Sequence, residues 1–186
     1  AKAANVGGIA GKVESEAAAT LEKVKEQDES GIYTNATIAN SYNTGAVQGY
    51  ANVGGVAGQM FNGSVAGSHN QGNLSATRTA SQTTSMEPLN LGGVVGDTTE
   101  MWTSDSDTTS GFGAVIYDVY NSGQVGDENY EFYGRHVGGV VGRLSGTLDR
   151  AFNTGEIYNG FSATGGLVGW WNYGYISNVF NTGNVT

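Results

Sequence analysis

The stretch that decides the fold is GGLVG at residues 165–169, followed by NVFNTGNV at residues 178–185. It combines two signatures. The first is a glycine pair followed by two small or branched apolar residues and a third glycine, and the second is Asn-x-Gly preceded by an aromatic residue or His. Both signatures recur along the chain and strictly alternate, which predicts a repeat architecture.

Each signature occurs five times. The glycine signatures begin at Gly7, Gly54, Gly92, Gly138 and Gly165, and the second signatures contain Asn43, Asn70, Asn121, Asn153 and Asn181. We therefore divide residues 1–186, taken as one domain, into units that start near residues 5, 52, 90, 136 and 163. The remaining segments, 14–31, 76–89 and 97–112, are expected to be insertions in surface loops.

Three aliphatic positions recur in the units. They are Ile38, Val65, Ile116, Leu148 and Ile176; then Val47, Leu74, Val125, Ile157 and Val185; then Ile9, Val56, Val94, Val140 and Leu167. Short apolar runs bounded by glycine or Asn-x-Gly favour strands. Equivalent strands stacked about 4.8 Å apart would pair every backbone group with a neighbour above and below. The pattern predicts an all-β fold, a parallel β-helix (β-solenoid) of about five rungs with one inserted amphipathic helix.

The corner residues of such a fold have structural explanations. Glycines supply a positive φ or a close backbone approach. Each repeated Asn can either adopt the left-handed conformation or form a side-chain hydrogen-bond ladder with the next rung, and we favour the ladder. The aromatic column is expected to stack ring on ring; it consists of Tyr42, His69, Tyr120, Phe152 and Phe180.

Glu14 to Ser30 carries the helical signal, with Ala17, Leu21 and Val24 on one stripe. We expect this helix to cover an open end or a flank of the stack, where it protects strand edges. A partner-binding helix is the alternative.

The composition excludes several classes of function. The net charge of −9 repels phosphate backbones and anionic lipids, so we expect no nucleic-acid partner. No apolar run approaches the roughly 20 residues that a membrane-spanning helix needs, so we expect no membrane insertion. Because the chain opens and closes on repeat signatures, we expect a segment cut from a longer protein at repeat boundaries.

The five Gly-Gly-aliphatic-x-Gly segments, each followed by x-Asn-x-Gly-x-aliphatic, resemble the GLUG motif repeats of bacterial surface proteins. Such repeats occur in filamentous-haemagglutinin-like adhesins and in immunoglobulin A-specific metallopeptidases. The resemblance implies a secreted or cell-surface location and a non-catalytic scaffold or spacer of an adhesin-like protein, with other domains of the same chain as partners. An accessory, substrate-holding segment of such a peptidase is the alternative.

Catalytic motifs are missing from the sequence. There is no His-Glu-x-x-His, no Gly-x-Ser-x-Gly and no cysteine, and we expect neither an enzyme nor a bound cofactor. His69 belongs to the aromatic column and His136 to the slot before a glycine pair, so both are expected to be structural. The glycine signature is not followed by Lys-Ser/Thr, which argues against a phosphate loop.

Acidic residues offer a weak calcium candidate. Asp97, Glu100, Asp105 and Asp107 lie in one polar stretch, and the Asp105-x-Asp107 pair could belong to a calcium site. The ligand spacing of an EF-hand is missing, which favours a solvated acidic loop. A second cluster, Asp127, Glu128 and Glu131, has the same interpretation.

Trp170, Trp171, Tyr173 and Tyr175 cluster in the last unit. They could stack on the sugar rings of a glycan or anchor a host protein. The alternative, which we favour, is that they pack against a following repeat or domain. The recurring Thr44, Thr154 and Thr182 suggest an ice-binding column as a minor alternative, but Gln71 and Ser122 interrupt it.

Overall fold

A computed structural model describes residues 4–15, 19–31, 35–77, 89–98, 113–128, 135–159 and 162–186. Within these ranges the chain is mainly β-strand and all strand pairs are parallel. The same ranges contain one helix, α1 (Leu21–Ser30). The expectation of a β-rich fold with parallel sheets and an inserted helix is therefore confirmed.

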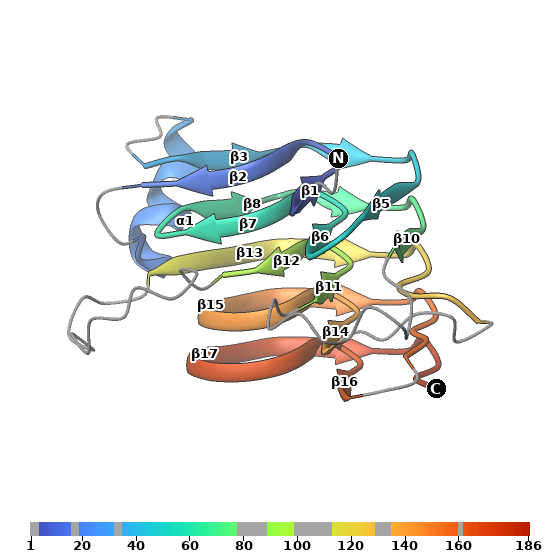
Figure 1. Cartoon of the computed structure of the whole chain (residues 1–186). Coiled ribbons are helices and arrows are strands. Elements are labelled where there is room, and N and C mark those ends of the chain that lie inside the picture. Colours follow the sequence, from blue (N-terminus) through green and yellow to red (C-terminus); the bar gives the residue numbers. More distant parts are fainter. Residues whose placement is uncertain are drawn as a thin grey trace, which may run out of the picture.

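The strands lie in five successive levels, from the N-terminus at one end of the molecule to the C-terminus at the other (Figure 1). The first level holds β1 (Asn5–Gly7), β2 (Ala10–Glu14), β3 (Thr37–Ala39), β4 (Tyr42–Asn43) and β5 (Val47–Gly49). The second holds β6 (Asn52–Gly54), β7 (Ala57–Phe61), β8 (Ser64–Ala66), β9 (His69–Asn70) and β10 (Leu74–Ala76). The third holds β11 (Asn90–Gly92), β12 (Val95–Asp97) and β13 (Ala114–Asn121). The fourth holds β14 (His136–Gly138) and β15 (Val141–Asn153), and the fifth holds β16 (Ala163–Gly165) and β17 (Val168–Asn181).

Equivalent strands of successive levels form the sheets. One sheet has the order β1-β6-β11-β14-β16, and a second has the order β2-β7-β12-β15-β13-β8-β3. The second sheet nearly closes on itself because the first part of β15 pairs with β12 and its later part with β13. A third ladder starts with β5 and β10 and continues through the single bridges Leu74–Val125, Val125–Ile157 and Ile157–Val185.

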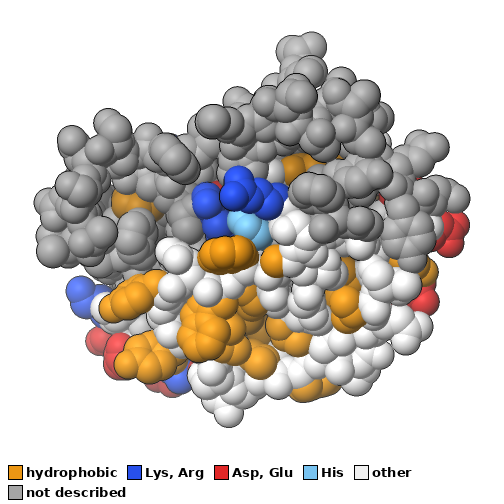
Figure 2. Space-filling model, turned by 60° about the horizontal axis from the view of Figure 1, so that its bottom comes forward, with side chains coloured by type: hydrophobic (Ala, Val, Ile, Leu, Met, Phe, Trp, Pro, Cys, Tyr) orange, Lys and Arg blue, Asp and Glu red, His pale blue; other side chains and the backbone are white. Residues whose placement is uncertain are grey.

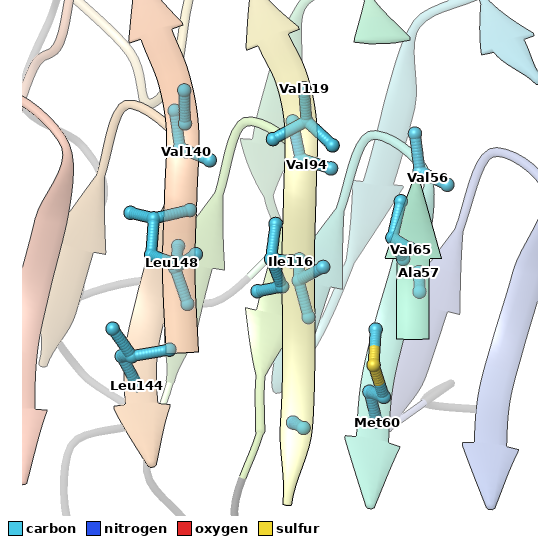
Figure 3. Packing of buried hydrophobic residues seen from close by; sticks show 14 of the residues in the cluster. Val56, Ala57, Met60, Val65, Val94, Ile116, Val119, Val140, Leu144 and Leu148 are labelled. Atoms are coloured by element: carbon cyan, nitrogen blue, oxygen red, sulfur yellow. The ribbon is translucent and has the colours of Figure 1, made fainter. Parts of the chain in front are cut away.

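The strand register confirms the aliphatic columns. Ile38 lies opposite Val65, Val65 opposite Ile116, and the same column continues through Leu148 to Ile176. Figure 3 shows the labelled members following one another from strand to strand. Val65, Ile116 and Leu148 have no exposed surface, whereas the end members are only partly buried. A full burial is worth about 1.5–3 kcal/mol for each such side chain, so each level depends on its neighbours.

The two sequence signatures meet at one corner of each level. A Cβ added to Gly55, the second glycine of its pair, would collide with the side chain of Asn70 and with the carbonyl of Gly93 in the next level. The same relation joins Gly93 to Asn121. The glycine pair is therefore required because the Asn side chain and the neighbouring backbone occupy the space of a Cβ.

A second corner was not predicted from the sequence. The residue three positions before each repeated Asn has a positive φ between 49° and 55°; the column consists of Asn40, Gly67, Asp118, Arg150 and Asn178. Asn, Asp and Gly tolerate this left-handed conformation, and Arg150 adopts it at some cost. The repeated Asn residues themselves have negative φ, so the left-handed alternative for them is wrong.

The inserted helix is shorter than expected. Glu14 ends β2, and the helix begins at Leu21 after Thr20, whose hydroxyl accepts a hydrogen bond from the backbone N–H of Lys23. Ala17 lies outside the described residues. Val24 is buried with Ala66, Val115 and Tyr117, so the helix covers a flank of the stack, as predicted.

The other insertion boundaries also need correction. Ala76 ends β10, and Leu89 is buried in the cluster formed by the Val47 column. Asp97 ends β12 and is fully buried. Each insertion therefore leaves the stack at least one residue later than the sequence indicated, and the second insertion re-enters it one residue earlier, at Leu89.

Candidate functional site

The exposed aromatic surface lies on the last level. Trp170, Trp171, Tyr173 and Tyr175 all belong to β17 and are between 49% and 77% exposed. Trp171 lies opposite Leu144, which is fully buried. Trp171 therefore continues a core column. It is exposed because, among the described residues, no further strand packs against the other side of β17. Figure 2 shows hydrophobic side chains gathered over this end.

A concavity separates these rings. It encloses about 410 Å³ and is lined by Trp171, Asn172, Tyr173, Gly174 and Tyr175. Two irregularities create it: the register between β15 and β17 shifts at Leu144/Ser145, and Gly174 turns the strand with a φ of 107°. Aromatic walls with one side-chain amide suit a flat, neutral ligand or an apolar segment of protein better than a charged group.

A buried polar cluster lies beside Trp170, whose ring centroid is 5.0 Å from that of His136. Asp97 accepts hydrogen bonds from Nε and Nη2 of Arg143 at 3.0 and 2.7 Å, and a third from Asn90 at 3.1 Å. The expectation that Asp97 belongs to a solvated acidic loop is thus wrong. The carboxylate is buried because the register places it directly opposite Arg143.

His136 continues a second amide ladder, Asn5–Asn52–Asn90, and lies 2.7 Å from Oδ1 of Asn90. Nδ2 of Asn90 donates to Asn52 and Asp97, so Oδ1 is the acceptor and His136 must donate from Nδ1. Burial, followed by the positive charges of Arg143 and Arg135, lowers the pKa of His136 to about 4. The imidazole is therefore neutral at physiological pH, and its hydrogen bond to Asn90 makes it the last member of this ladder.

The repeated Asn residues form the predicted ladder. Nδ2 of each Asn donates to Oδ1 of the Asn in the next level at 2.8 Å, from Asn43 through Asn70, Asn121 and Asn153 to Asn181. Each Nδ2 also donates to the carbonyl of the glycine two residues later. In the first four levels, each Asn thus uses one amide hydrogen to join the next level and the other to hold the turn of its own level.

The aromatic column is also confirmed. Its ring centroids are 4.4 to 5.4 Å apart and the rings are parallel within 10°. A groove of about 280 Å³ beside it is lined in part by Tyr120, Phe152, Phe180, Asp118 and Arg150. Because the ring faces are covered by one another, only the terminal rings could offer a face to a sugar.

The helix is tied to the flank by a further polar cluster. Asp149 accepts hydrogen bonds from Ser177 and Asn178, both at 2.7 Å, and pairs with Lys25 of α1 at 3.3 Å. Burial alone would raise the pKa of Asp149, but the hydrogen bonds from Asn178, Ser177 and Lys25 outweigh burial and lower it. Nζ of Lys25 also lies 5.2 Å from the ring centre of Tyr117.

The calcium candidates Asp105 and Asp107 lie outside the described residues, as do Glu100 and Glu131. Asp127 and Glu128 follow the third level, and the described part of the chain contains no group of three or more potential metal ligands. Calcium binding therefore remains a prediction from the sequence.

Comparisons with protein-family models, with curated proteins and with solved structures find no match to this chain. In the described ranges, no helix has the length and apolar character needed to cross a membrane.

The sequence did not predict two buried polar features beside Trp170: the Asn5–Asn52–Asn90–His136 ladder and the Asp97–Arg143 pair. The ladder had a usable signal, because Asn or His precedes four of the glycine pairs by two residues. The pair had none, since its members are 46 residues apart and meet only through the register.

Proposed function

We propose that the chain is a parallel β-solenoid that serves as a non-catalytic scaffold or spacer of a secreted or cell-surface protein. The observation that carries the proposal is the unbroken Asn ladder through all five levels. The side-chain amides of these Asn residues bond to one another and so join the levels. The residues that resemble GLUG motifs are the same Asn and glycine residues, which supports the surface location.

A spacer separates what is attached to its two ends. The N-terminal strand lies in the first level and the C-terminal strand in the fifth, at opposite ends of the stack (Figure 1). Each level adds about 4.8 Å along the axis. The distance between the two ends of such a scaffold therefore increases by a fixed amount with each added unit.

The proposal can be tested by double electron–electron resonance, which measures the distance between spin labels attached to Thr44→Cys and Thr182→Cys. Both side chains are exposed, one in the first level and one in the last. A duplicate of residues 136–162 should lengthen the distance by about 4.8 Å and keep the distribution narrow. An unchanged distance or a broad distribution would argue against a rigid spacer, as would a catalytic activity removed by one substitution in an insertion.

Glycan binding is a second candidate, favoured by the concavity lined by Trp171, Tyr173 and Tyr175. The native chain should then bind a glycan array, and Trp171→Ala should lose that binding while keeping the circular-dichroism spectrum. An array without hits removes this candidate.

A further inference from the structure

Three polar side chains from distant segments meet at the carboxylate of Asp149, in the fourth level. Oδ1 accepts hydrogen bonds from the hydroxyl of Ser177 and from Nδ2 of Asn178, both at 2.7 Å, and Oδ2 lies 3.3 Å from Nζ of Lys25 in α1. The side chain of Asp149 is only 3% exposed. An amine and a carboxamide are therefore bound to the two oxygens of one buried carboxylate.

The repeat does not explain a carboxylate at this position. The equivalent residues of the other levels are Ala39, Ala66, Tyr117 and Ser177, none of which is charged at neutral pH. Burial of a carboxylate costs free energy unless charged or hydrogen-bonding groups compensate it. Asp149 therefore belongs to the cluster around it rather than to the columns that hold the levels together.

The backbone holds Asn178 in place. This residue occupies the left-handed corner with a φ of 52°, and its amide donates to Asp149 of the preceding level. The same relation occurs one level earlier, where Nη1 of Arg150 donates to the hydroxyl of Tyr117 at 2.7 Å. The corner conformation of the stack therefore positions the carboxamide of Asn178 at Asp149.

Helix α1 brings Lys25 to the same carboxylate. The neighbouring Val24 is buried against the flank of the stack, and Figure 1 shows α1 alongside β8 and β13. Nζ of Lys25 also lies over the ring of Tyr117, 5.2 Å from its centre. The amine is therefore held by an aromatic ring as well as by the carboxylate of Asp149.

We propose that Nζ of Lys25 and the side-chain carboxamide of Asn178 form an isopeptide bond, with Asp149 as the catalytic base and acid. The nucleophile and the leaving group lie on the two oxygens of one carboxylate, so protons can pass between them through Asp149. The fold holds both reactants together, which replaces a reaction between separate molecules by a local one.

The steps balance without any further reactant. Asp149 is ionised at neutral pH, because its hydrogen bonds outweigh burial and keep its pKa low, and Oδ2 takes a proton from the ammonium group of Lys25. Neutral Nζ then attacks Cγ of Asn178, and a C–N bond forms. The carboxyl group gives its proton to Nδ2, the Cγ–Nδ2 bond breaks, and ammonia leaves past the Lys25 side chain, which is 43% exposed. The second proton lost by Nζ passes through the same carboxylate to the ammonia, so the products are one amide bond and one ammonium ion.

The bond joins the inserted helix of the first level to β17 of the fifth level. The levels between them cannot then separate from the helix without breaking a covalent bond. An ion pair with a partly exposed lysine contributes little stability by itself. Each chain reacts once, so this inference adds a modification to the proposed scaffold and not an enzymatic activity.

Intact mass spectrometry of the full chain tests the proposal. The native chain should weigh less than its sequence by the mass of one ammonia molecule. Trypsin should fail to cleave after Lys25, and fragmentation should give a branched peptide that joins Lys25 to Asn178. A mass equal to that of the sequence after prolonged incubation at neutral pH, or a loss of water in place of ammonia, would overturn the proposal.

Three substitutions separate the roles of the three groups. Lys25→Arg keeps the positive charge but removes the primary amine. Asn178→Gly removes the carboxamide, and Gly67 occupies the same left-handed corner in the second level. Asp149→Ala removes the base, and Ala66 occupies the same column. Each variant should keep the full mass of its own sequence, and a loss of ammonia that persists in any of them would contradict the assigned role.

Lys12→Arg is the matched control. Lys12 pairs with Glu14 at 2.7 Å, both side chains are about half exposed, and no carboxamide of the described residues is bonded to Glu14. This variant should lose ammonia as the native chain does, and a full mass would count against the proposal. Val24→Asp, which displaces the helix, should keep the full mass. The distance between spin labels at the two ends does not depend on this bond, so it tests the scaffold separately.

Discussion

The side-chain amide of Asn121 donates a hydrogen bond to Oδ1 of Asn153, 2.8 Å away, although the two residues are 32 positions apart in the sequence. Both side chains are fully buried. Each sits at the corner of its own level, so the bond joins two levels that have no covalent connection at that point. The same relation repeats through the stack and makes the Asn ladder the most direct target for mutation.

Asn121→Ala should lower the free energy of unfolding by about 3 kcal/mol, because it removes two ladder bonds and leaves buried partners unsatisfied. Asn181→Ala is the matched control. It lies in the last level, is partly exposed and has one ladder partner, so we expect a loss of about 1 kcal/mol. Urea denaturation of both variants measures the difference, and equal losses would count against the ladder.

Replacement of the glycine of Asn-x-Gly by alanine should lower the free energy of unfolding only in levels that are preceded by another level. A Cβ on Gly123 would collide with the carbonyl of Gly72, whereas a Cβ on Gly45 in the first level would have Oδ1 of Asn43 as its nearest neighbour, at 3.7 Å. Gly123→Ala should therefore cost about 1–3 kcal/mol of unfolding free energy. Gly45→Ala should stay within about 0.5 kcal/mol of the native chain. Similar costs at the two sites would contradict the stacking.

His136 should make the stack acid-sensitive. Its pKa in the folded chain is about 4, below the ordinary value of 6.5, so the unfolded chain binds the proton first as the pH falls. The free energy of unfolding should decrease from about pH 6.5 to pH 4 by up to about 3 kcal/mol and then level off for this group.

The variant His136→Asn carries the same residue type as the equivalent positions of the other levels, which are Asn5, Asn52 and Asn90. It should abolish the part of the pH dependence between pH 6.5 and 4. The loss of stability below about pH 3.8 that comes from the lowered pKa of Asp149 should remain. Identical pH profiles for the two proteins would show that His136 does not titrate in this way.

A substitution in the buried side of helix α1 should detach the helix from the stack without unfolding the strands. Val24→Asp places a charge against Ala66, Val115 and Tyr117, and an isolated helix of ten residues is unstable in water. Hydrogen exchange should then show loss of protection across residues 21–30, with β13 and β15 still protected. Glu22→Ala, on the exposed side of the helix, should change neither region. Loss of protection in all strands would mean that the helix is part of the core.

Regular repetition explains what the sequence could predict. The aliphatic columns, the Asn ladder and the aromatic stack each keep one residue type at one spacing from the signatures, so their alignment follows from the repeat itself. Ring contacts between His69 and Tyr120 follow from position alone, although the two residues differ.

The features that were missed depend on context. The left-handed corner holds residues as different as Gly67 and Arg150, so only the backbone conformation is shared. Asp97 looked like part of a solvated loop because its partner, Arg143, lies one full level away. Because the insertions differ in length, the sequence separation between paired residues of adjacent levels varies, and local spacing does not predict such pairs.

The central claim, that successive units stack in register as levels, is tested most directly by disulfide formation in a chain that has no cysteine of its own. Thr154 and Thr182 are exposed and follow the paired residues Asn153 and Asn181 of adjacent levels, while Ser122 occupies the same position one level further away. Thr154→Cys/Thr182→Cys should oxidise to an intramolecular disulfide, because adjacent levels lie about 4.8 Å apart. Ser122→Cys/Thr182→Cys, at about twice that distance, should remain reduced as a monomer. Equal oxidation of both variants, or none in the first, would contradict the stacked arrangement.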